Sequence, residues 1–375
     1  MSRRVLVGVV GCGLIAQVMH LPHLAELDDR FQVAALCDLD PELGAACARR
    51  YQVPKVFTDW RDLVAEPLDA VLVLTSGSHA PVAVGASRAG AHVFVEKPMC
   101  LSPGEGREMV AAAEAASVRL MVGTMKRYDP AYRRLLELLP DAGELRLVQV
   151  TTLESPFEPY VAAYPLLRGK GAPEDVVARL GAEEARVLAD LLPEADDNTR
   201  FCYRWMLLDN LVHELNMLRG ALGEPDRINF VSLDRRVVEL SLTFGSTECH
   251  LSWVDLPGMA RYSQELAFFG LDKRLTLTLP SPYLRGMPTE LRAEAGRRGS
   301  PHSWQTVETV SYEEAFKREL LEFHEAIVTG RNPHTDGMDG LRDVSLCQAL
   351  AQSHMRGAPV ELRPEVPSRA GGASG

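Results

Sequence analysis

The segment Val5–Gln17, with the sequence VLVGVVGCGLIAQ, constrains the fold of this chain more than any other. Its first six residues form an apolar run rich in valine, which is typical of a strand buried in a parallel sheet. Two glycines and an alanine follow in the pattern G-x-G-x-x-A, ahead of a segment compatible with a helix. Such a turn lets a dinucleotide pyrophosphate approach the backbone and face the N–H groups of a helix N-terminus. The residues predicted to contact a dinucleotide here are Gly11, Gly13, Leu14, Ile15 and Ala16.

A second apolar run, FQVAALCD at residues 31–38, ends in Asp38, which lies 22 residues after Ala16. An acidic side chain at this spacing accepts hydrogen bonds from the hydroxyls of an adenine ribose and repels a 2′-phosphate. The next residue is Leu39 and not an arginine. These features favour NAD over NADP as the cofactor. The alternative is a tight strand-to-helix turn that binds no nucleotide.

Length and composition limit the kinds of protein that this chain can be. Its 375 residues suffice for two domains with substantial cores. The composition, with 46% hydrophobic and 24% charged residues, is ordinary for a globular protein. The net charge is −11 and no basic stripe is present, which argues against nucleic acid or an anionic membrane as a partner. The seven cysteines include no C-x-x-C pair. We therefore expect reduced thiols in a cytoplasm, with no disulfide framework and no metal site.

Two targeting signals are weakly matched near the N-terminus. Arg3-Arg4 before an apolar run has the form of a twin-arginine export signal, and Val10-Gly11-Cys12 that of a lipoprotein cleavage site. Both would require residues 5–10 to be a disposable apolar region, yet the same residues are needed as the first strand. We expect neither signal, and no apolar run approaches the roughly 18 residues of a membrane span.

Three later apolar runs, at residues 68–76, 92–95 and 118–123, alternate with helical segments. This alternation predicts an α/β fold with a Rossmann dinucleotide-binding domain over residues 1–125. The carboxyl ends of parallel strands line the ligand crevice of such a domain. The runs at residues 68–76 and 92–95 both end in polar residues that would lie at that edge. For Glu96-Lys97-Pro98, which follows the second of them, the alternative is a charged turn exposed to solvent. The predicted cofactor contacts at this edge are Thr75, Ser76, His79, Glu96 and Lys97.

The second half of the chain changes to strands of alternating polarity. In residues 238–244 apolar and polar side chains alternate, so one face is buried and the other is polar. Gly245-Ser246 lies between two such runs and predicts a two-residue hairpin loop. Further strands are expected near residues 144–154, 227–234, 247–255, 264–270 and 273–279, and helices at 313–329 and 340–355. We predict a C-terminal α+β domain with an open, largely antiparallel sheet over 126–363, and a disordered tail at 364–375.

The motifs taken together resemble the glucose–fructose oxidoreductase / inositol dehydrogenase (Gfo/Idh/MocA) family. The resemblance rests on G-C-G-L-I-A, Asp38, the loop to His79, A-G-x-H-V-x-x-E-K-P and the K-R-Y-x-P of residues 126–130. It runs from the N-terminus to about residue 135 and resumes from Asp209 to about Val360. It implies an NAD(P)-dependent oxidoreductase acting on CH–OH groups. It also implies that Asp209 and His213 form the D-x-x-x-H that faces the nicotinamide in that family.

Asp209 and His213 are four residues apart in a predicted helix over 207–220, which places them on one face. On spacing alone, a surface ion pair is the commoner explanation of such a pair. Given the resemblance, His213 would exchange the hydroxyl proton, Lys97 would stabilise alkoxide charge, and Asp209 would orient His213 or hold a substrate hydroxyl. The residues predicted to bind substrate are Lys97, Lys126, Arg127, Tyr128, Asp209 and His213, with interdomain ion pairs as the alternative for residues 126–128.

One stretch departs from the family pattern. Between Glu154 and Asp209 the family usually has a shorter connection with a glycine-rich run before the D-x-x-x-H. Here a helical, acidic segment spans Pro173–Leu192, and the bulky residues Phe201–Trp205 replace the glycines. Large side chains at a cleft wall imply a reshaped substrate pocket. For the insertion at residues 158–205 a lid, an oligomer contact and simple decoration all stay open.

The resulting prediction is a cytoplasmic oxidoreductase that uses NAD(H). Its expected substrate is a small molecule, namely a secondary alcohol or ketone of a sugar, a cyclitol or a related polyol. The alternatives are an NAD(H)-binding sensor or interaction protein without turnover, and an NADPH-dependent reductase of another carbonyl. An exposed face on the second sheet predicts a homo-oligomer, a dimer or a tetramer.

Overall fold

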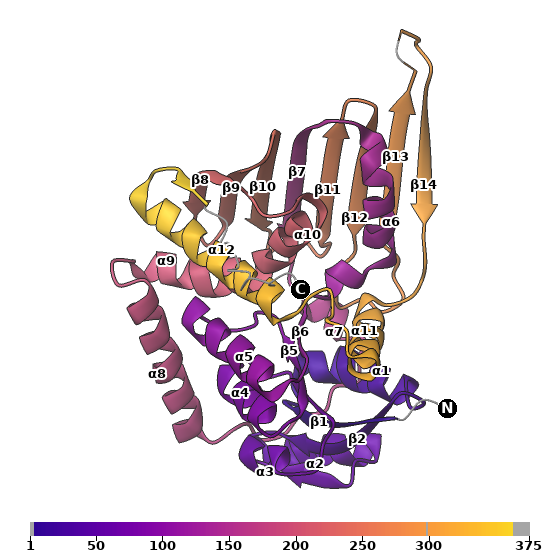
Figure 1. Ribbon diagram of the computed structural model, residues 1–375. Helices are drawn as coiled ribbons and strands as arrows, with labels where there is room; N and C mark the ends of the chain where they lie inside the picture. The colour runs from indigo at the N-terminus through magenta and orange to yellow at the C-terminus, as the bar shows by residue number, and fades with distance from the viewer. Residues whose placement is uncertain (1–3, 298, 363–375) are drawn as a thin grey trace, which may run out of the picture.

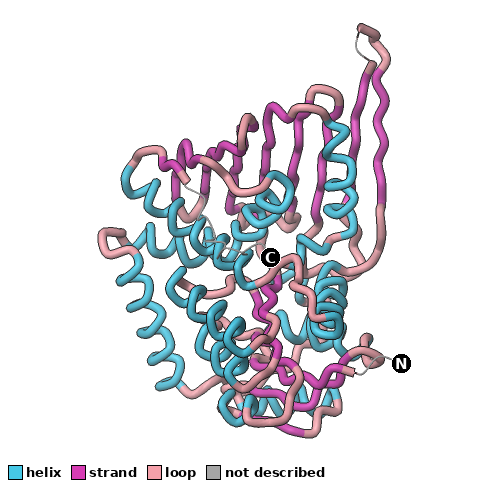
Figure 2. Tube along the Cα trace, viewed as in Figure 1, coloured by secondary structure: helices cyan, strands magenta, loops and turns pink. Residues whose placement is uncertain are grey.

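The computed structural model describes residues 4–297 and 299–362, so the predicted disordered tail lies outside the described residues. Two sheets organise this part of the chain, a six-stranded sheet in the lower part of Figure 1 and a nine-stranded sheet in the upper part. Helices lie against the lower sheet and between the two sheets (Figure 2). Among the helices of the described residues, none combines the length and the hydrophobicity needed to cross a membrane.

The first sheet has six parallel strands in the order β3-β2-β1-β4-β5-β6. The strand order reverses between β1 and β4, and this is the point at which such sheets bind ligands. The predicted Rossmann fold is confirmed, whereas the short edge strand β3 was not predicted. The strands are β1 (Val5–Val10), β2 (Phe31–Cys37), β3 (Lys55–Phe57), β4 (Ala70–Val73), β5 (His92–Glu96) and β6 (Leu120–Gly123).

Helices connect these strands, and their first turns follow from the sequence. Asp40 accepts hydrogen bonds from the backbone N–H groups of Glu42 and Leu43, and Pro41 fills the first position of α2. Ser102 and Glu105 form a capping box at the start of α5. The helical elements are η1 (Ala16–His20, a π-helix), α1 (Leu21–Glu26), α2 (Pro41–Tyr51), α3 (Trp60–Val64), α4 (Ala80–Arg88) and α5 (Pro103–Ala116).

The second sheet is mixed and largely antiparallel, in the order β14-β13-β12-β11-β7-β10-β9-β8-β15. Within this second sheet, only the pairing of β7 with β10 is parallel among the described strands. This agrees with the predicted sheet, and Gly245-Ser246 closes the β9–β10 hairpin as expected. Its strands are β7 (Leu145–Glu154), β8 (Arg227–Leu233), β9 (Val237–Phe244), β10 (Thr247–Asp255), β11 (Ser263–Gly270), β12 (Lys273–Leu279), β13 (Glu290–Gly296), β14 (Ser303–Thr309) and β15 (Val360–Glu361).

Two C-terminal helices, α11 (Ala315–Thr329) and α12 (Gly337–Arg356), pack back against the first sheet and its helices. Helix α11 contacts η1 and β6, while α12 contacts α5 and also β8 of the second sheet. Because these helices cross the predicted boundary at residues 125 and 126, the division into domains stays a prediction. The same packing joins the two sheets into one body around the end of β6 (Figure 1).

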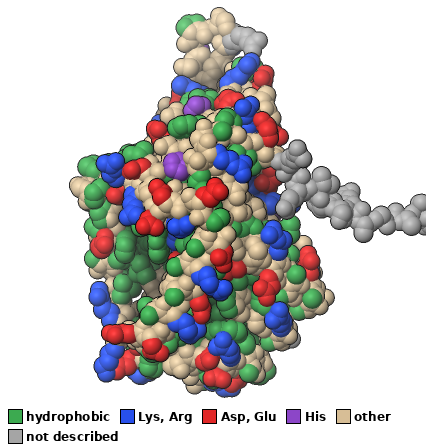
Figure 3. Space-filling view, turned by 90° about the vertical axis from the view of Figure 1, so that its left-hand side faces the viewer, with side chains coloured by type: hydrophobic (Ala, Val, Ile, Leu, Met, Phe, Trp, Pro, Cys, Tyr) green, Lys and Arg blue, Asp and Glu red, His purple; other side chains and the backbone are tan. Residues whose placement is uncertain are grey.

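Between β7 and β8 the chain forms the predicted insertion and the helix that follows it. Helix α8 stands at the left edge of Figure 1, and its side chains Val177 and Leu180 are exposed. Figure 3 views that side of the molecule, where hydrophobic side chains gather in a hollow. The helical elements not yet given are η2 (Met125–Tyr128), α6 (Pro130–Leu138), η3 (Leu139–Ala142), α7 (Glu158–Val161), α8 (Glu174–Leu191), α9 (Asp197–Phe201), η4 (Cys202–Leu211, a π-helix) and α10 (Val212–Leu222).

Candidate active site

The loop after β1 has the two properties that a pyrophosphate-binding turn needs. Gly11 has a φ of +98°, and a Cβ atom there would lie 2.8 Å from the carbonyl carbon of Leu74 in the neighbouring strand segment. Gly13 is exposed, and a Cβ atom there would meet nothing within 4 Å. The first glycine therefore makes the turn possible, and the second leaves open space in front of the backbone. The loop fits a dinucleotide, with Leu14 and Ile15 half-buried beside the opening.

Asp38 lies at the end of β2, next to this loop. One carboxylate oxygen accepts a hydrogen bond from the backbone N–H of Cys12 at 2.7 Å, and the other accepts from the backbone N–H of Asp40 at 2.8 Å. These bonds fix the carboxylate at the rim of the glycine loop. Each oxygen retains further acceptor capacity, which suits the hydroxyls of a ribose.

The loop after β4 places its three predicted contact residues differently. Ser76 is exposed and Thr75 is half-buried, so both remain candidates for cofactor contact. His79 is buried, and its ring nitrogens lie 2.9 Å from the carbonyl oxygen of Pro98 and 2.6 Å from that of Thr75. Burial lowers the pKa of His79, so the ring carries one N–H and donates to one of these carbonyls at a time. His79 thus ties two cofactor-edge loops together.

Lys97 follows β5 and joins the two halves of the site. Its Nζ atom donates to the backbone carbonyl of Asp209 at 2.8 Å and to a carboxylate oxygen of the same residue at 3.1 Å. Burial disfavours the charged amine, but the carboxylates of Asp209 and Glu96 outweigh it, and the pKa of Lys97 lies above its usual value. An ammonium group is therefore present at the end of the parallel sheet at neutral pH.

The helix that carries Asp209 and His213 is not regular. Asp209 belongs to the π-helix η4, whereas His213 lies in the first turn of α10. The prediction of one regular helix over 207–220 is therefore wrong in its first part, where the hydrogen bonds run from i to i+5. This widens the turn in which the carbonyl and the carboxylate of Asp209 both reach Lys97. π-Helical turns occur often at functional sites.

His213 has the features of a neutral base. Its Nδ1 atom is buried and lacks a hydrogen-bond partner in the described structure, while the residue as a whole is half-buried. Burial, together with the positive charges of Lys126 and Lys97, lowers the pKa of His213 well below its usual value. The imidazole is therefore uncharged at neutral pH and able to accept a proton.

Lys126 lies in a buried polar network on the second sheet. Its Nζ atom donates to Gln264 Oε1 at 2.6 Å and to the hydroxyl of Tyr262 at 3.3 Å. Gln264 and Thr152 in turn donate to Glu214. Burial lowers the pKa of Lys126, although the carboxylate of Glu214 opposes this change. This network sets Lys126 beside His213 and accounts for its effect on that imidazole.

Arg127 and Tyr128 are not brought to this cluster. Arg127 donates to the backbone carbonyl and the side-chain oxygen of Asn216, and lies 3.8 Å from a carboxylate oxygen of Asp339. The hydroxyl of Tyr128 is buried, 2.8 Å from that of Thr335. Both side chains link the start of the second half of the chain to the C-terminal segment. This matches the alternative given above, in which residues 126–128 form contacts between the two halves. The predicted role of Arg127 and Tyr128 in substrate binding is corrected accordingly.

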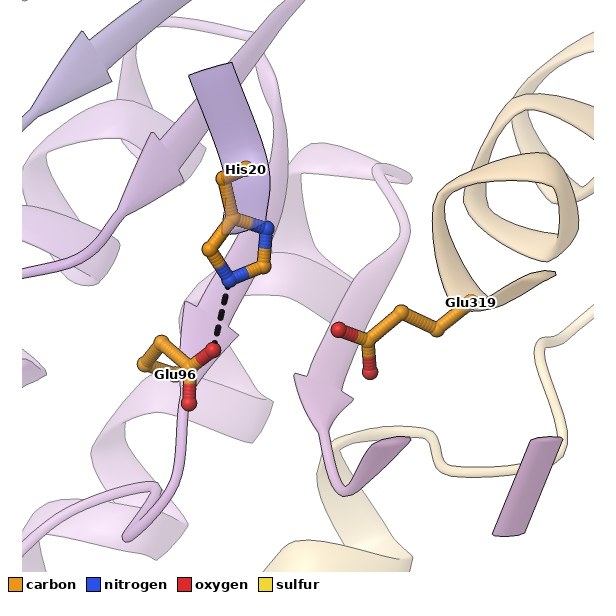
Figure 4. Close-up of side chains that lie close together, drawn as sticks. All are labelled: His20, Glu96 and Glu319. Carbon is orange, nitrogen blue, oxygen red and sulfur yellow. Dashed lines mark hydrogen bonds and ion pairs between the residues drawn. The ribbon is translucent and has the colours of Figure 1, made fainter. Parts of the chain in front are cut away.

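Glu96 was predicted to contact the cofactor, but its side chain is buried in a separate cluster. His20 Nε2 lies 2.6 Å from its Oε1, at hydrogen-bond distance, and the backbone N–H of Lys97 donates to its Oε2 at 3.0 Å. Glu319 of α11 points at this pair from the other side (Figure 4). Because its carboxylate faces the protein interior, the prediction that the Glu96 side chain contacts the cofactor is corrected.

The insertion lies along the rim of the cofactor loop. The backbone of Leu167 exchanges two hydrogen bonds with the side chain of Gln17, and the N–H of Gly171 donates to Asp40 at 2.5 Å. Farther along, Glu184 of α8 accepts a hydrogen bond from Arg204 at 2.9 Å. The insertion therefore contacts the first βαβ unit and is more than a surface decoration.

The bulky residues before Asp209 are placed in two environments. Tyr203 is fully buried and donates to the carbonyl oxygen of Leu101 at 2.8 Å, so it does not line an open cleft as predicted. Arg204 is buried and stacks on Trp205, whose side chain is 42% exposed. Of these three residues, only Trp205 can contact a ligand.

Sequence reasoning missed Tyr283, whose phenol is affected by the charge of Lys97, and Glu154, whose carboxylate acts on Lys126. Burial raises the pKa of both side chains. Glu154 closes a predicted strand, and its terminal position was an available signal. Tyr283 lies in a proline-containing loop after β12, where no pattern distinguished it.

Comparison with known proteins gives one family match and several similar chains. Residues 5–124 match the family model described as "Oxidoreductase family, NAD-binding Rossmann fold". The chain is 24% identical to myo-inositol 2-dehydrogenase of Thermotoga maritima, over 96% of this chain and 99% of that protein. Levoglucosan dehydrogenase in complex with NADH has a TM-score of 0.74 at 18% identity, covering 96% of this chain and 100% of that one. A 3-ketoreductase from Actinomadura kijaniata, solved with NADP, has a TM-score of 0.69 at 22% identity, covering 92% and 96%.

Proposed function

We propose that this chain is an NAD(H)-dependent oxidoreductase of sugars, cyclitols or related polyols, because residues 5–124 match the oxidoreductase family model with an NAD-binding Rossmann fold. It moves a hydride between the nicotinamide and a secondary alcohol or the matching ketone. The similarity to a myo-inositol 2-dehydrogenase and to levoglucosan dehydrogenase supports this substrate class. The observation that carries the proposal is the pairing of Lys97 with Asp209, together with the neutral imidazole of His213, whose pKa Lys97 helps to lower and whose Nδ1 has no hydrogen-bond partner in the described structure.

The roles of the three residues follow from their charge states. The cofactor, when bound, accepts or supplies the hydride. His213 is uncharged and takes the hydroxyl proton during oxidation, or returns it during ketone reduction. The ammonium of Lys97 donates a hydrogen bond to the reacting oxygen and stabilises its developing negative charge. Asp209 holds Lys97 in place through two acceptors.

The preferred cofactor in this proposal is NAD. Asp38 at the rim of the glycine loop suits a ribose with free hydroxyls, and its charge repels a 2′-phosphate. The site residues that hold the dinucleotide are Gly11, Gly13, Leu14, Ile15, Ala16, Asp38, Thr75 and Ser76. Since the similar structures include complexes with NADH and with NADP, both cofactors belong in the test.

The proposal also includes a cytoplasmic location and a homo-oligomeric assembly. The seven cysteines are all free and buried in the described structure, which fits a reducing compartment. Large apolar side chains are exposed on strands of the second sheet, which suits contact with another copy of the chain. They are Phe230, Val237, Trp304 and Val307.

The test is turnover of a polyol and ketose panel by the purified chain, followed through the absorbance of NADH and NADPH. We expect His213→Ala to reduce kcat by at least about a hundredfold while NADH affinity changes little, because general acid–base catalysis contributes at least that much. The matched control is His250→Ala, since His250 is an exposed histidine on β10. Unchanged activity of His213→Ala, on a substrate that the wild type turns over, would remove the assigned role.

A further inference from the structure

A buried ionisable cluster lies directly behind Lys97 and is not used in the reaction described above. His20 ends η1, Glu96 ends β5 and Glu319 projects from α11, so three separate elements bring the side chains together (Figure 4). His20 and Glu319 are 0% exposed and Glu96 is 5% exposed. One nitrogen or oxygen atom from each side chain lies within 4.8 Å of the others. The walls are apolar, with Phe94 and Phe316 in edge contact with the His20 ring.

The hydrogen bonds assign different charge states to the two carboxyl groups. Glu96 accepts a hydrogen bond from the backbone N–H of Lys97, and its Oε1 lies 2.6 Å from His20 Nε2, which is a second donor in the tautomer that carries its proton there. Neither oxygen of Glu319 has a partner in the described structure, although both are buried. An ionised carboxylate without donors in apolar surroundings is very unfavourable, and two adjacent anions more so. Two adjacent anions are disfavoured here, and of the two carboxyl groups only Glu96 has a backbone N–H donor within the described part of the chain.

We propose that Glu96 is a positioning residue that keeps Lys97 in its ammonium form, and that Glu319 holds the proton which leaves Glu96 ionised. The inference rests on the proposed function, in which the ammonium of Lys97 meets the reacting oxygen. Glu96 precedes Lys97 in the chain and accepts its backbone N–H, so it fixes the direction in which β5 delivers that side chain. Its negative charge also opposes the effect of burial on Lys97.

Other charged or titratable groups around the cluster come from four further elements. His79 and Tyr283 interact with the charge of Glu96, and Tyr128 is the titratable side chain that faces Glu319. Asp209 supplies the second negative charge at Lys97. Because Asp209 is 37% exposed in its side chain and Glu96 is buried, water screens the charge of Glu96 less.

The same three residues could in principle hold a divalent cation, but the geometry favours a proton. The 2.6 Å between His20 Nε2 and Glu96 Oε1 is a hydrogen-bond distance. Two ligands of one tetrahedral zinc ion lie about 3.3 Å apart. A metal-bound histidine also usually donates its other ring nitrogen to a partner, and His20 Nδ1 has none in the described structure.

The experiment compares Glu96→Gln with Glu319→Gln, each nearly isosteric with the native side chain. The readout is the pH at which Lys97 becomes half reactive toward trace acetic anhydride, followed on its peptide by mass spectrometry. We expect Glu96→Gln to lower that pH by about one unit, because the nearest buried anion is lost. Glu319→Gln should leave it within about 0.3 units, since an amide replaces an already neutral acid. In infrared spectra, Glu319→Gln should remove a protonated-carboxyl band that the wild type shows.

The contrary outcomes are distinct. A shift in Glu319→Gln without one in Glu96→Gln would place the charge on Glu319, and no shift in either would end the electrostatic role. Stoichiometric zinc in the purified wild type that is lost in Glu319→Gln would make the cluster a metal site. If Glu96→Gln does not fold, the infrared band of the wild type still decides whether Glu319 is protonated. Because these readouts need no substrate, failure of the proposed function would appear separately, as absence of turnover.

Discussion

The two glycines of the cofactor loop allow folding and cofactor binding to be separated by substitution. Gly11→Ala forces an L-residue to a φ of +98° and brings its Cβ to 2.8 Å from the Leu74 carbonyl, so we expect the free energy of unfolding to fall by about 3 kcal/mol. Gly13→Val adds a side chain where the protein has nothing within 4 Å. We expect it to change stability by less than about 0.5 kcal/mol. It should raise the NADH Kd at least about tenfold, or about 1.4 kcal/mol, because the side chain fills the path of the pyrophosphate.

Urea unfolding measures the first quantity, and NADH fluorescence titration measures the second. Gly90→Ala is the control that measures the cost of the backbone conformation alone. Gly90 also has a positive φ, of +85°, but a Cβ atom there meets nothing within 4 Å. The reasoning is refuted if Gly13→Val binds NADH as tightly as the wild type while retaining its fold. It is equally refuted if Gly11→Ala is no less stable than Gly90→Ala.

Asp209, Asp38 and His23 give three further predictions. Asp209→Asn removes a charge that raises the pKa of Lys97, so the alkaline limb of the kcat/KM profile should move to lower pH; an unmoved limb would contradict the ion pair. Asp38→Ala should weaken NAD binding and relax the exclusion of NADP, and an unaltered ratio of the two Kd values would show that Asp38 does not contact the ribose. Burial lowers the pKa of His23 from 6.5 to about 4, so the unfolded state binds more protons in that window. The free energy of unfolding should fall by up to about 3 kcal/mol as the pH drops from 6.5 to 4, and His23→Gln should flatten this dependence in urea denaturation.

Patterns that are local in the sequence predicted the structure well. The run of residues 5–10 and the following glycines depend on neighbours in the chain, and the parallel sheet, the family resemblance and the Gly11 turn are confirmed. Alternation in residues 238–244 likewise predicted a strand with one buried face. By contrast, β13 and β14 were not predicted, because ELRAEAG is mostly half-buried, SWQTVET is largely exposed, and both carry little apolar alternation.

Features that depend on distant contacts were predicted poorly. Glu96 follows a strand as a cofactor contact would, yet its environment is set by Glu319, which is more than two hundred residues away. Arg127 and Tyr128 were grouped with Lys126 because the three are adjacent. In a 3₁₀ turn adjacent side chains point in different directions, and only Lys126 reaches the polar network beside His213. The π-helix at Asp209 also had no signal in hydrophobic spacing.

The hydrogen bonds of residues 165–171 bear on any attempt to remove the insertion at residues 158–205. Excision of the insertion would strip Gln17 of both backbone partners at Leu167, and Arg50 of the Pro165 carbonyl to which it donates at 2.8 Å. In a trimmed variant water would hydrate the exposed Arg50, whereas the buried Gln17 would keep only its bond to the Cys12 carbonyl and its side-chain oxygen would lose the Leu167 donor. Engineering of this edge has to redesign the first two helices together with the excised loop.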